Sequence, residues 1–373
     1  MTQRCDDFQV TAPAVAILGL PFHIIDLEGA VQAVCRAAMT RRRLLLSTPN
    51  VNFVIQAQKD AQFRNSVLAS HISLADGMPI VWVSKLFGLP LTQRVSGADL
   101  FEALASRYCD HPLRVYFFGG ENGVAERAAY TLNQQPRGLL AVGHQSPGFG
   151  SVSDLSDSKV LAAINSTDPD LLVVSISAKK GQEWILRNFR DLNAPVIANL
   201  GAVVNFTAGA VKRSPPIVAR AGMEWLWRIT QEPHLFARYT SDAVGLASLL
   251  MSIAGFKVLT HRRRFVSRAL IPSIYGDAER FNVHLSGSLC ETARRTLAHC
   301  LPPHKKPKKV DIIVDDLSDI NPQGLADLML WIGSLLRTGH DVRLRCSKFS
   351  TRREFGKHAA ETLLDSNKPS GST

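Results

Sequence analysis

Asp76 stands where a catalytic base would be expected. It directly follows the apolar run of residues 72–75, and the glycine after it, Gly77, leaves room for a ligand to approach closely. A carboxylate in this position can accept the proton of an attacking hydroxyl group, so Asp76 is our candidate general base. Judged by spacing alone, an ordinary turn or a cap for the helix expected from about Pro79 is the commoner role of such an aspartate.

Polar residues and glycines also follow most of the other apolar runs. Ligands of open α/β sheets bind beyond the carboxyl ends of the strands, so these residues are candidates for a binding site. They are Thr48, Asn50, Gly119, Gly120, Gly143, His144, residues 177–182 with Gln182, and Gly201. Asn50 would serve equally well as a helix cap. The turn at Gly119 and Gly120 leads from a strand into a helix, which suits a phosphate, although many such turns only connect elements.

The sequence offers no convincing metal site. Asp168 and Asp170 have the spacing of a metal-binding Asp-x-Asp motif, but they precede an apolar run and therefore lie at the wrong edge of the sheet. His144, His299 and His304 belong to no recognisable set of ligands. We therefore expect no metal, and cationic side chains and helix N-termini must meet the charge of any diphosphate.

Residues 212–239 supply such cations. Their arginines are interleaved with tryptophans, a pattern that suits phosphates at a membrane interface but equally an amphipathic docking helix. These residues are Arg213, Arg220, Arg228, Arg238, Trp225 and Trp227. The apolar segment that follows, residues 243–256, is too short to span a bilayer but can lie in its interface beside Arg262, Arg263 and Arg264. The alternative is a buried helix between two domains.

These candidate residues need a sheet to bring them together. From Val15 to about Asn205, β-rich runs alternate with segments of helical period, which predicts an α/β fold with a parallel, Rossmann-like sheet. The runs begin at Val15, Arg43, Ile72, Arg114, Leu139, Leu171 and Val196. A β/α pattern restarts at about Tyr275 and continues to about Asp365. We therefore expect a second, smaller α/β domain.

Charge and cysteine content restrict the class of protein. The net charge of +11 indicates an anionic partner, either nucleic acid, an acidic bilayer or a phosphorylated substrate, and no nucleic-acid-binding motif is present. The six cysteines are widely spaced without a Cys-x-x-Cys pair, which argues against a zinc site or a disulfide framework and favours the cytoplasm. Neither a signal peptide nor a spanning segment is expected.

Several ordered motifs resemble those of one family. They are TPNVNFV, ADGMPIVW, RVSGADLF, FFGGENGVAERAA, PDLLVVSIS followed by KGQEWI, NLGAVVNFTAG, and GMEWLWRITQEPHLFARY. Over about residues 15–239 the chain resembles the WecG/TagA/CpsF glycosyltransferases. The resemblance implies an inverting, metal-independent transferase without a cofactor, which moves a sugar from a UDP-sugar to a polyprenyl-diphosphate-linked saccharide in exopolysaccharide, capsule or related glycan synthesis.

The resemblance also implies roles for single residues. By it Asp76 is the catalytic base, and Arg94, which opens RVSGADLF, lies near the leaving phosphates. The other implied substrate-binding residues are Thr48, Asn50, Gly119, Gly120, Gln182, Arg228 and Arg238. Two departures stand out: KKGQ replaces the Pro-Lys-Gln-Glu sequence of many members, and Leu235 replaces an arginine.

The expected organisation has three parts. Residues 1–210 form the catalytic domain, residues 211–270 a basic, amphipathic, membrane-binding appendage, and residues 271–373 a domain with a polar tail that resembles a STAS domain. The positions that often carry a phosphorylatable serine pair there hold Pro322 and Gln323, so we expect constitutive docking of a protein partner. The enzyme would act at the inner face of the cell membrane as a peripheral protein. The rival interpretation is a non-catalytic membrane-associated scaffold.

Overall fold

The computed structural model describes residues 7–148, 150–215, 218, 222–258, 268–277, 279–300 and 308–364. Some residues singled out from the sequence lie outside this set. They are Arg220, Arg262, Arg263, Arg264, His304 and the polar tail after residue 364. The side chains of residues 255–258 are likewise not described.

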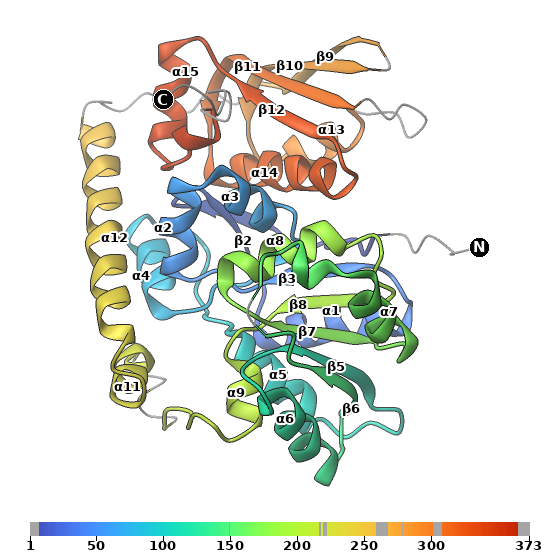
Figure 1. Cartoon of the computed structure of the whole chain (residues 1–373). Coiled ribbons are helices and arrows are strands. Elements are labelled where there is room, and N and C mark those ends of the chain that lie inside the picture. The colour runs from blue at the N-terminus through green and yellow to red at the C-terminus, as the bar shows by residue number, and fades with distance from the viewer. Residues whose placement is uncertain are drawn as a thin grey trace.

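A parallel sheet with six strands in the described residues forms the centre of the N-terminal half, in the order β4-β3-β8-β7-β5-β6 (Figure 1). The strands are β3 (Leu44–Ser47), β4 (Ile72–Ser73), β5 (Leu113–Gly119), β6 (Leu139–Gln145), β7 (Leu171–Ser175) and β8 (Val196–Asn199). β3, β7 and β8 are buried along their whole length, as strands covered on both faces must be. The prediction of a parallel α/β sheet is confirmed.

Alternate residues of each strand enter different cores. On one face Leu46 and Phe117 pack against α1 (Leu27–Met39), α5 (Gly97–Ser106) and α6 (Val124–Gln134). On the other face Leu45 and Phe118 pack with Trp184 of α8 (Ala178–Asn188), and Ile164 of α7 (Ser158–Ser166) joins them. This two-sided burial fixes the strand ends, and with them the loops that carry the candidate residues.

The expected first strand does not belong to this sheet. Residues of the run from Val15 form β1 (Ala14–Ile17), which pairs only with β2 (Leu20–His23) as an antiparallel hairpin in the described structure. Leu18 and Gly19 at its turn both have positive φ, 51° and 83°, as two-residue hairpin turns require. The prediction that this run joins the parallel sheet is therefore wrong.

The second domain has a sheet of its own, in the order β12-β11-β10-β9. Its strands are β9 (Ile271–Gly276), β10 (Arg280–Leu289), β11 (Lys309–Ile320) and β12 (Asp341–Arg345), and its helices are α13 (Ala293–Ala298), α14 (Pro322–Arg337) and α15 (Phe349–Gly356). β9 pairs antiparallel with β10, and the other pairs are parallel. The predicted second α/β domain is confirmed, and its likeness to a STAS domain stays a prediction.

The two domains share one core. α14 lies over the β1–β2 hairpin and over α3 (Ala61–Leu68) (Figure 1), and a single apolar cluster runs from Ala14 to Leu364. Gly333 of α14 comes so close to α3 that an added Cβ would lie 1.8 Å from the Leu68 carbonyl oxygen. The Arg337 guanidinium donates a hydrogen bond to the carbonyl of Ala69 at 2.8 Å. The second domain is thus packed onto the first rather than attached by a linker alone.

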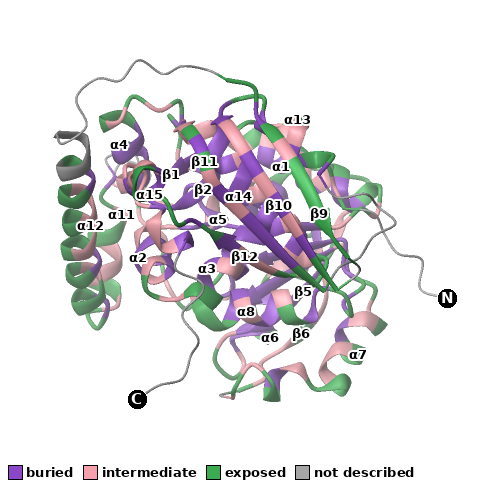
Figure 2. Cartoon of the chain, turned by 90° about the horizontal axis from the view of Figure 1, so that it is seen from above, coloured by how far each residue is buried: buried purple, intermediate pink, exposed green. Residues whose placement is uncertain are grey.

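Residues 243–256 are part of a longer helix, α12 (Leu235–Val258), which flanks both domains (Figure 1). α12 packs on α2 (Val51–Lys59) at Gly245, where an added Cβ would lie 2.9 Å from the Ile55 side chain. Its Ile253 is buried, whereas the side of α12 that faces away from the domains is largely exposed (Figure 2). No helix within the described residues is both long and apolar enough to cross a membrane.

Candidate active site

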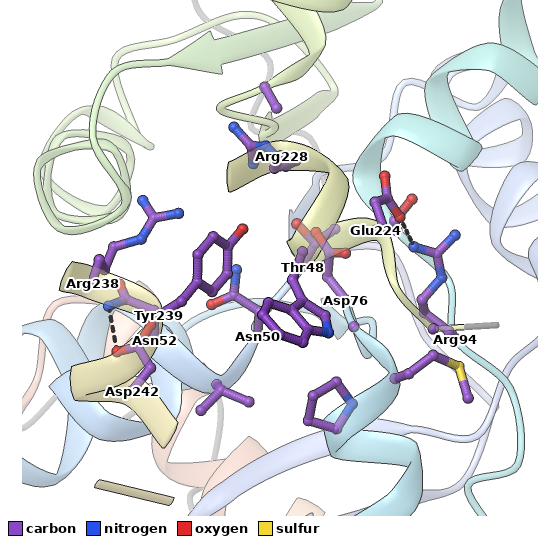
Figure 3. A pocket seen from close by; sticks show the side chains of 18 of the residues that line it. Thr48, Asn50, Asn52, Asp76, Arg94, Glu224, Arg228, Arg238, Tyr239 and Asp242 are labelled. Carbon is purple, nitrogen blue, oxygen red and sulfur yellow. Dashed lines mark hydrogen bonds and ion pairs between the residues drawn. The ribbon is translucent and has the colours of Figure 1, made fainter. Parts of the chain in front are cut away.

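A cavity of about 570 Å³ lies between the carboxyl ends of β3, β4 and β8 and three helices, α4 (Met78–Leu86), α11 (Glu224–Gln231) and α12 (Figure 3). The loops after the strands contribute Thr48, Asn50 and Asp76, and α9 (Val203–Thr207) contributes Phe206. The polar residues from α11 and α12 are Glu224, Arg228, Arg238, Tyr239, Thr240 and Asp242. The predicted appendage is therefore one wall of the pocket.

The loop after β4 presents Asp76 to the cavity. The Asp76 amide donates to the carbonyl of Pro49 at 3.0 Å, which ties this loop to the one after β3. The next residue, Gly77, has φ +119° and occupies the cap position of α4, where no side chain caps the helix. Asp76 is therefore not a helix cap, and its side chain is left free for chemistry.

The environment of Asp76 suits a base. Burial raises its pKa to about 7, with Arg94 as the strongest opposing charge and Glu224 and Asp99 acting in the same direction as burial. Within the described residues no group donates a hydrogen bond to its carboxylate, and the carboxylate lines the cavity. A carboxylate with a pKa near neutrality can take up a proton in the transition state without being protonated beforehand.

Arg94 is held beside Asp76 by two acidic side chains. It pairs with Asp99 at 2.7 Å and with Glu224 of α11, and its own side chain is mostly buried. Asp99 also pairs with Arg213, which in turn pairs with Glu102. This chain of alternating charges connects α5 to the segment that leads into α11.

Thr48 and Asn50 line the cavity, and Asn50 also stabilises the start of a helix. Asn50 caps α2, because its side chain accepts a hydrogen bond from the Phe53 amide at 3.2 Å, and it also lines the cavity. Thr48 is buried and lines the cavity one residue before Pro49. The helix-cap role considered for Asn50 is therefore confirmed, and its binding role stays a prediction.

Two arginines of the helical wall differ in their pairing. Arg228 pairs with Glu232 at 2.9 Å, and its guanidinium lies 6.0 Å from the centroid of the Phe206 ring. Arg238 lies over the ring of Tyr239 at 5.1 Å, and no carboxylate of the described residues comes within ion-pair distance of it. Arg238 is thus available to an anionic ligand without first leaving a partner.

Several predicted site residues lie outside the cavity lining. They are Gly143, His144 and residues 177–181, together with three that the family resemblance also implies, Gly119, Gly120 and Gln182. Gly119 packs on the end of β7, where an added Cβ would lie 2.5 Å from the Ser175 carbonyl, and the Gly120 amide donates to that carbonyl at 2.9 Å. Gln182 is fully buried on α8 and does not line the cavity. The two glycines therefore have a packing role in this structure, and the binding roles predicted for all three residues stay predictions.

The two aspartates of the Asp-x-Asp motif form ion pairs instead of facing the cavity. Asp168 and Asp170 pair with Arg41 at 2.6 Å and 3.3 Å, ahead of β7 and away from the cavity lining. Among the described residues, no group of three or more histidine, cysteine, aspartate or glutamate side chains is placed to hold a metal ion.

Sequence reasoning missed six polar residues of the pocket. They are Asn52, Ser96, Glu224, Tyr239, Thr240 and Asp242. A signal was present, because Glu224 and Arg228, and likewise Arg238 and Asp242, are spaced by one helical turn and so share a helix face with an arginine already selected.

Comparison with known proteins gives the chain a family. The model of the glycosyl transferase WecG/TagA/CpsF family matches residues 15–258, which include α11 and α12. A protein of Bacillus spizizenii is 27% identical over 53% of this chain and 74% of its own length. A protein of Staphylococcus aureus is 28% identical over 57% of this chain and 83% of its own length. Both are named N-acetylglucosaminyldiphosphoundecaprenol N-acetyl-β-D-mannosaminyltransferase. The chain belongs to the WecG/TagA/CpsF family of glycosyltransferases.

Proposed function

We propose that this glycosyltransferase moves a sugar, with inversion and without a metal, from a UDP-sugar to a polyprenyl-diphosphate-linked saccharide. The observation that carries the proposal is the position of Asp76, which faces the cavity with a pKa of about 7 and has arginines on the surrounding walls. The names of the two relatives support an acceptor of this kind. They also make N-acetylmannosamine the first sugar to test.

Asp76 would act as the general base of a direct displacement. A hydroxyl oxygen of the acceptor attacks the anomeric carbon of the donor while the bond from that carbon to the diphosphate oxygen breaks. The hydroxyl proton passes to Asp76, and UDP leaves with the electron pair of the broken bond. One base is enough for such a step, because attack and departure occur on opposite faces of the sugar.

The arginines would neutralise the two diphosphates of the reaction. Arg94, which the family resemblance places near the leaving phosphates, lines the cavity and would meet the charge that develops on the departing UDP. Arg228 and Arg238 line the helical wall of the same cavity. Guanidinium groups bind phosphate oxygens in a bidentate geometry, which a metal-free site needs.

The surface around the pocket supports a place at the membrane. Large apolar side chains of α4, α11 and α12 and of the residue before α11 are exposed there, namely Trp82, Leu86, Met223, Trp225, Leu226, Phe236, Val244 and Met251. Trp82, Trp225 and Phe236 also line the cavity. Contact of this surface with the anionic inner face of the cell membrane would bring a lipid-linked acceptor to the site.

No described residue of the second domain lines the cavity. We keep the proposal that it is a STAS-like docking module for a protein partner. Because it shares a core with the first domain, such a partner would bind to one packed body. The rival function, a scaffold without catalysis, would need none of the charge arrangement around Asp76.

Transfer can be tested with purified full-length protein, a panel of UDP-sugars and a synthetic prenyl-diphosphate-N-acetylglucosamine, with products identified by mass spectrometry and the linkage by NMR. We expect one donor to be used, with an inverted anomeric centre and unchanged rates in EDTA. Folded protein that transfers no sugar would favour the scaffold. Activity lost in EDTA and restored by Mg²⁺ or Mn²⁺ would overturn the metal-free mechanism.

A further inference from the structure

Asp242 is a buried carboxylate in the wall of the cavity that the mechanism above does not use. It lies on α12, is 7% exposed, and lines the pocket. One of its oxygens accepts a hydrogen bond from the side-chain amide of Asn52 on α2 at 3.0 Å (Figure 3). In the described part of the chain, no group donates to its second oxygen.

The surroundings of Asp242 disfavour its ionised form. Burial raises the pKa of Asp242, against the hydrogen bond from Asn52 and the charges of Arg238 and Lys59. A desolvated carboxylate with an unused oxygen is less stable than an apolar side chain packed at the same place. One neutral hydrogen bond between α2 and α12 does not require a charged group. A ligand that donates hydrogen bonds to the second oxygen would offset the cost.

The residues beside Asp242 indicate what kind of ligand would donate these hydrogen bonds. Arg238 precedes Asp242 by one helical turn and has no carboxylate partner among the described residues, and Tyr239 places an aromatic ring in the same wall. A carboxylate accepts hydrogen bonds from sugar hydroxyls, an arginine binds a diphosphate, and an aromatic ring covers the apolar face of a sugar. Together they match a saccharide that carries a diphosphate.

The two ends of the pocket suit different substrates, one the donor and the other the acceptor. In Figure 3 the Arg94–Glu224 pair and the Asn52–Asp242 pair lie at opposite ends, with Asp76 between them. An inverting displacement brings the acceptor from the side opposite the leaving group. If Arg94 faces the departing UDP, the acceptor occupies the end of Asp242, beside a helix whose Val244 and Met251 are exposed apolar residues.

We propose that Asp242 binds hydroxyl groups of the acceptor saccharide and thereby helps to determine which acceptor is used. The inference rests on the proposed transferase function. It assigns the end of the pocket on α12 to the saccharide diphosphate of the acceptor.

Kinetics and binding of full-length Asp242→Asn and Asp242→Ala test this assignment. Asp242→Asn keeps an oxygen for Asn52 but removes the charge and turns a donor toward the cavity. We expect KM for a soluble prenyl-diphosphate-saccharide to rise about 10-fold or more, the scale of a lost charge-assisted hydrogen bond, while KM for the UDP-sugar changes less than about 2-fold. The matched control is Ser241→Ala, an exposed neighbour outside the cavity lining, which should leave both constants unchanged.

Calorimetric titration with the acceptor analogue alone gives a readout that needs no turnover, and thermal unfolding checks the fold of each variant. Weaker acceptor binding by folded Asp242→Asn would support the assignment. Unchanged acceptor binding, or an equal loss for donor and acceptor, would overturn it. Wild-type protein that binds the acceptor but transfers no sugar would count against the proposed function instead.

Discussion

Glu224 of α11 forms an ion pair with Arg94, 130 positions earlier in the chain, and so joins the helical wall of the pocket to the loops of the sheet. Arg94 is also held by Asp99, at 2.7 Å. With both carboxylates in place, Arg94 stays beside Asp76 and acts on it as the strongest opposing charge. The pair therefore makes the environment of Asp76 depend on the docking of α11.

Replacing Glu224 by Gln tests this dependence through pH. The charge of Glu224 raises the pKa of Asp76, so its removal should lower that pKa and move the acidic limb of kcat/KM to lower pH. The rate at the optimum should fall about 10-fold because Arg94 loses one of its two anchors. Glu126→Gln, which removes an exposed charge from α6 outside the cavity lining, should leave the profile unchanged. An unshifted limb in Glu224→Gln would mean that the pair only stabilises the fold.

The sequence predicts those site residues that directly follow a strand in the chain. Thr48, Asn50 and Asp76 follow buried strands, and the parallel sheet brings them to one cavity. Only the family resemblance points to Arg94. The sequence does not predict Glu224 and Asp242, because their place in the site depends on how α11 and α12 dock on elements far earlier in the chain.

Long-range packing also explains why the run from Val15 is wrongly predicted to join the parallel sheet. The run from Val15 is as apolar as the strands of the sheet, but its burial comes from α14, more than 300 positions later. Nothing in the local pattern distinguishes a strand covered by a neighbouring domain from one inside a parallel sheet. The place of residues 243–256 likewise depends on long-range contacts, because α12 packs on α2, far earlier in the chain.

Exposed apolar residues outside the cavity lining provide a test of membrane binding. Leu226, Val244 and Met251 are exposed on α11 and α12 and do not line the pocket. Changing all three to Gln should reduce sedimentation with anionic liposomes, because less apolar surface would enter the bilayer interface. Activity on a water-soluble acceptor should persist. The same substitution at Met39 and Tyr130, exposed on α1 and α6, serves as the control, and equal sedimentation of both variants would place the contact elsewhere.

Gly333 tests whether the two domains are held as one body. Gly333→Ala forces α14 away from the Leu68 carbonyl, and overpacking of this kind typically costs about 1–3 kcal/mol. We expect a lower free energy of unfolding in urea. Ser334→Ala removes a hydroxyl that, among the described residues, donates to the carbonyl of Trp331 in the same helix, and it should change this free energy by less than about 0.5 kcal/mol. A Gly333→Ala protein as stable as the wild type would show that the domains can separate without cost.

The raised pKa of Asp76 also predicts a pH-dependent stability. Because the pKa of the folded state lies above the value of the unfolded chain, ionisation of Asp76 lowers the stability of the folded protein as pH rises from about 4 to about 7. Asp76→Asn removes this cost, so at pH 8 it should unfold at a temperature no lower than the wild type. The difference should shrink toward pH 4. A variant less stable than the wild type at pH 8 would contradict a half-buried carboxylate without an ion pair among the described residues.

Turnover by Asp76→Asn is the most direct measurement of the central claim, that Asp76 is the base of a sugar transfer. The substitution keeps the size of the side chain and removes its basicity. With fold confirmed by thermal unfolding and UDP binding by calorimetry, we expect transfer to fall by about 100-fold or more while the dissociation constant for UDP stays within about 2-fold of the wild type. Transfer at a near-normal rate by the folded variant would contradict the role of Asp76.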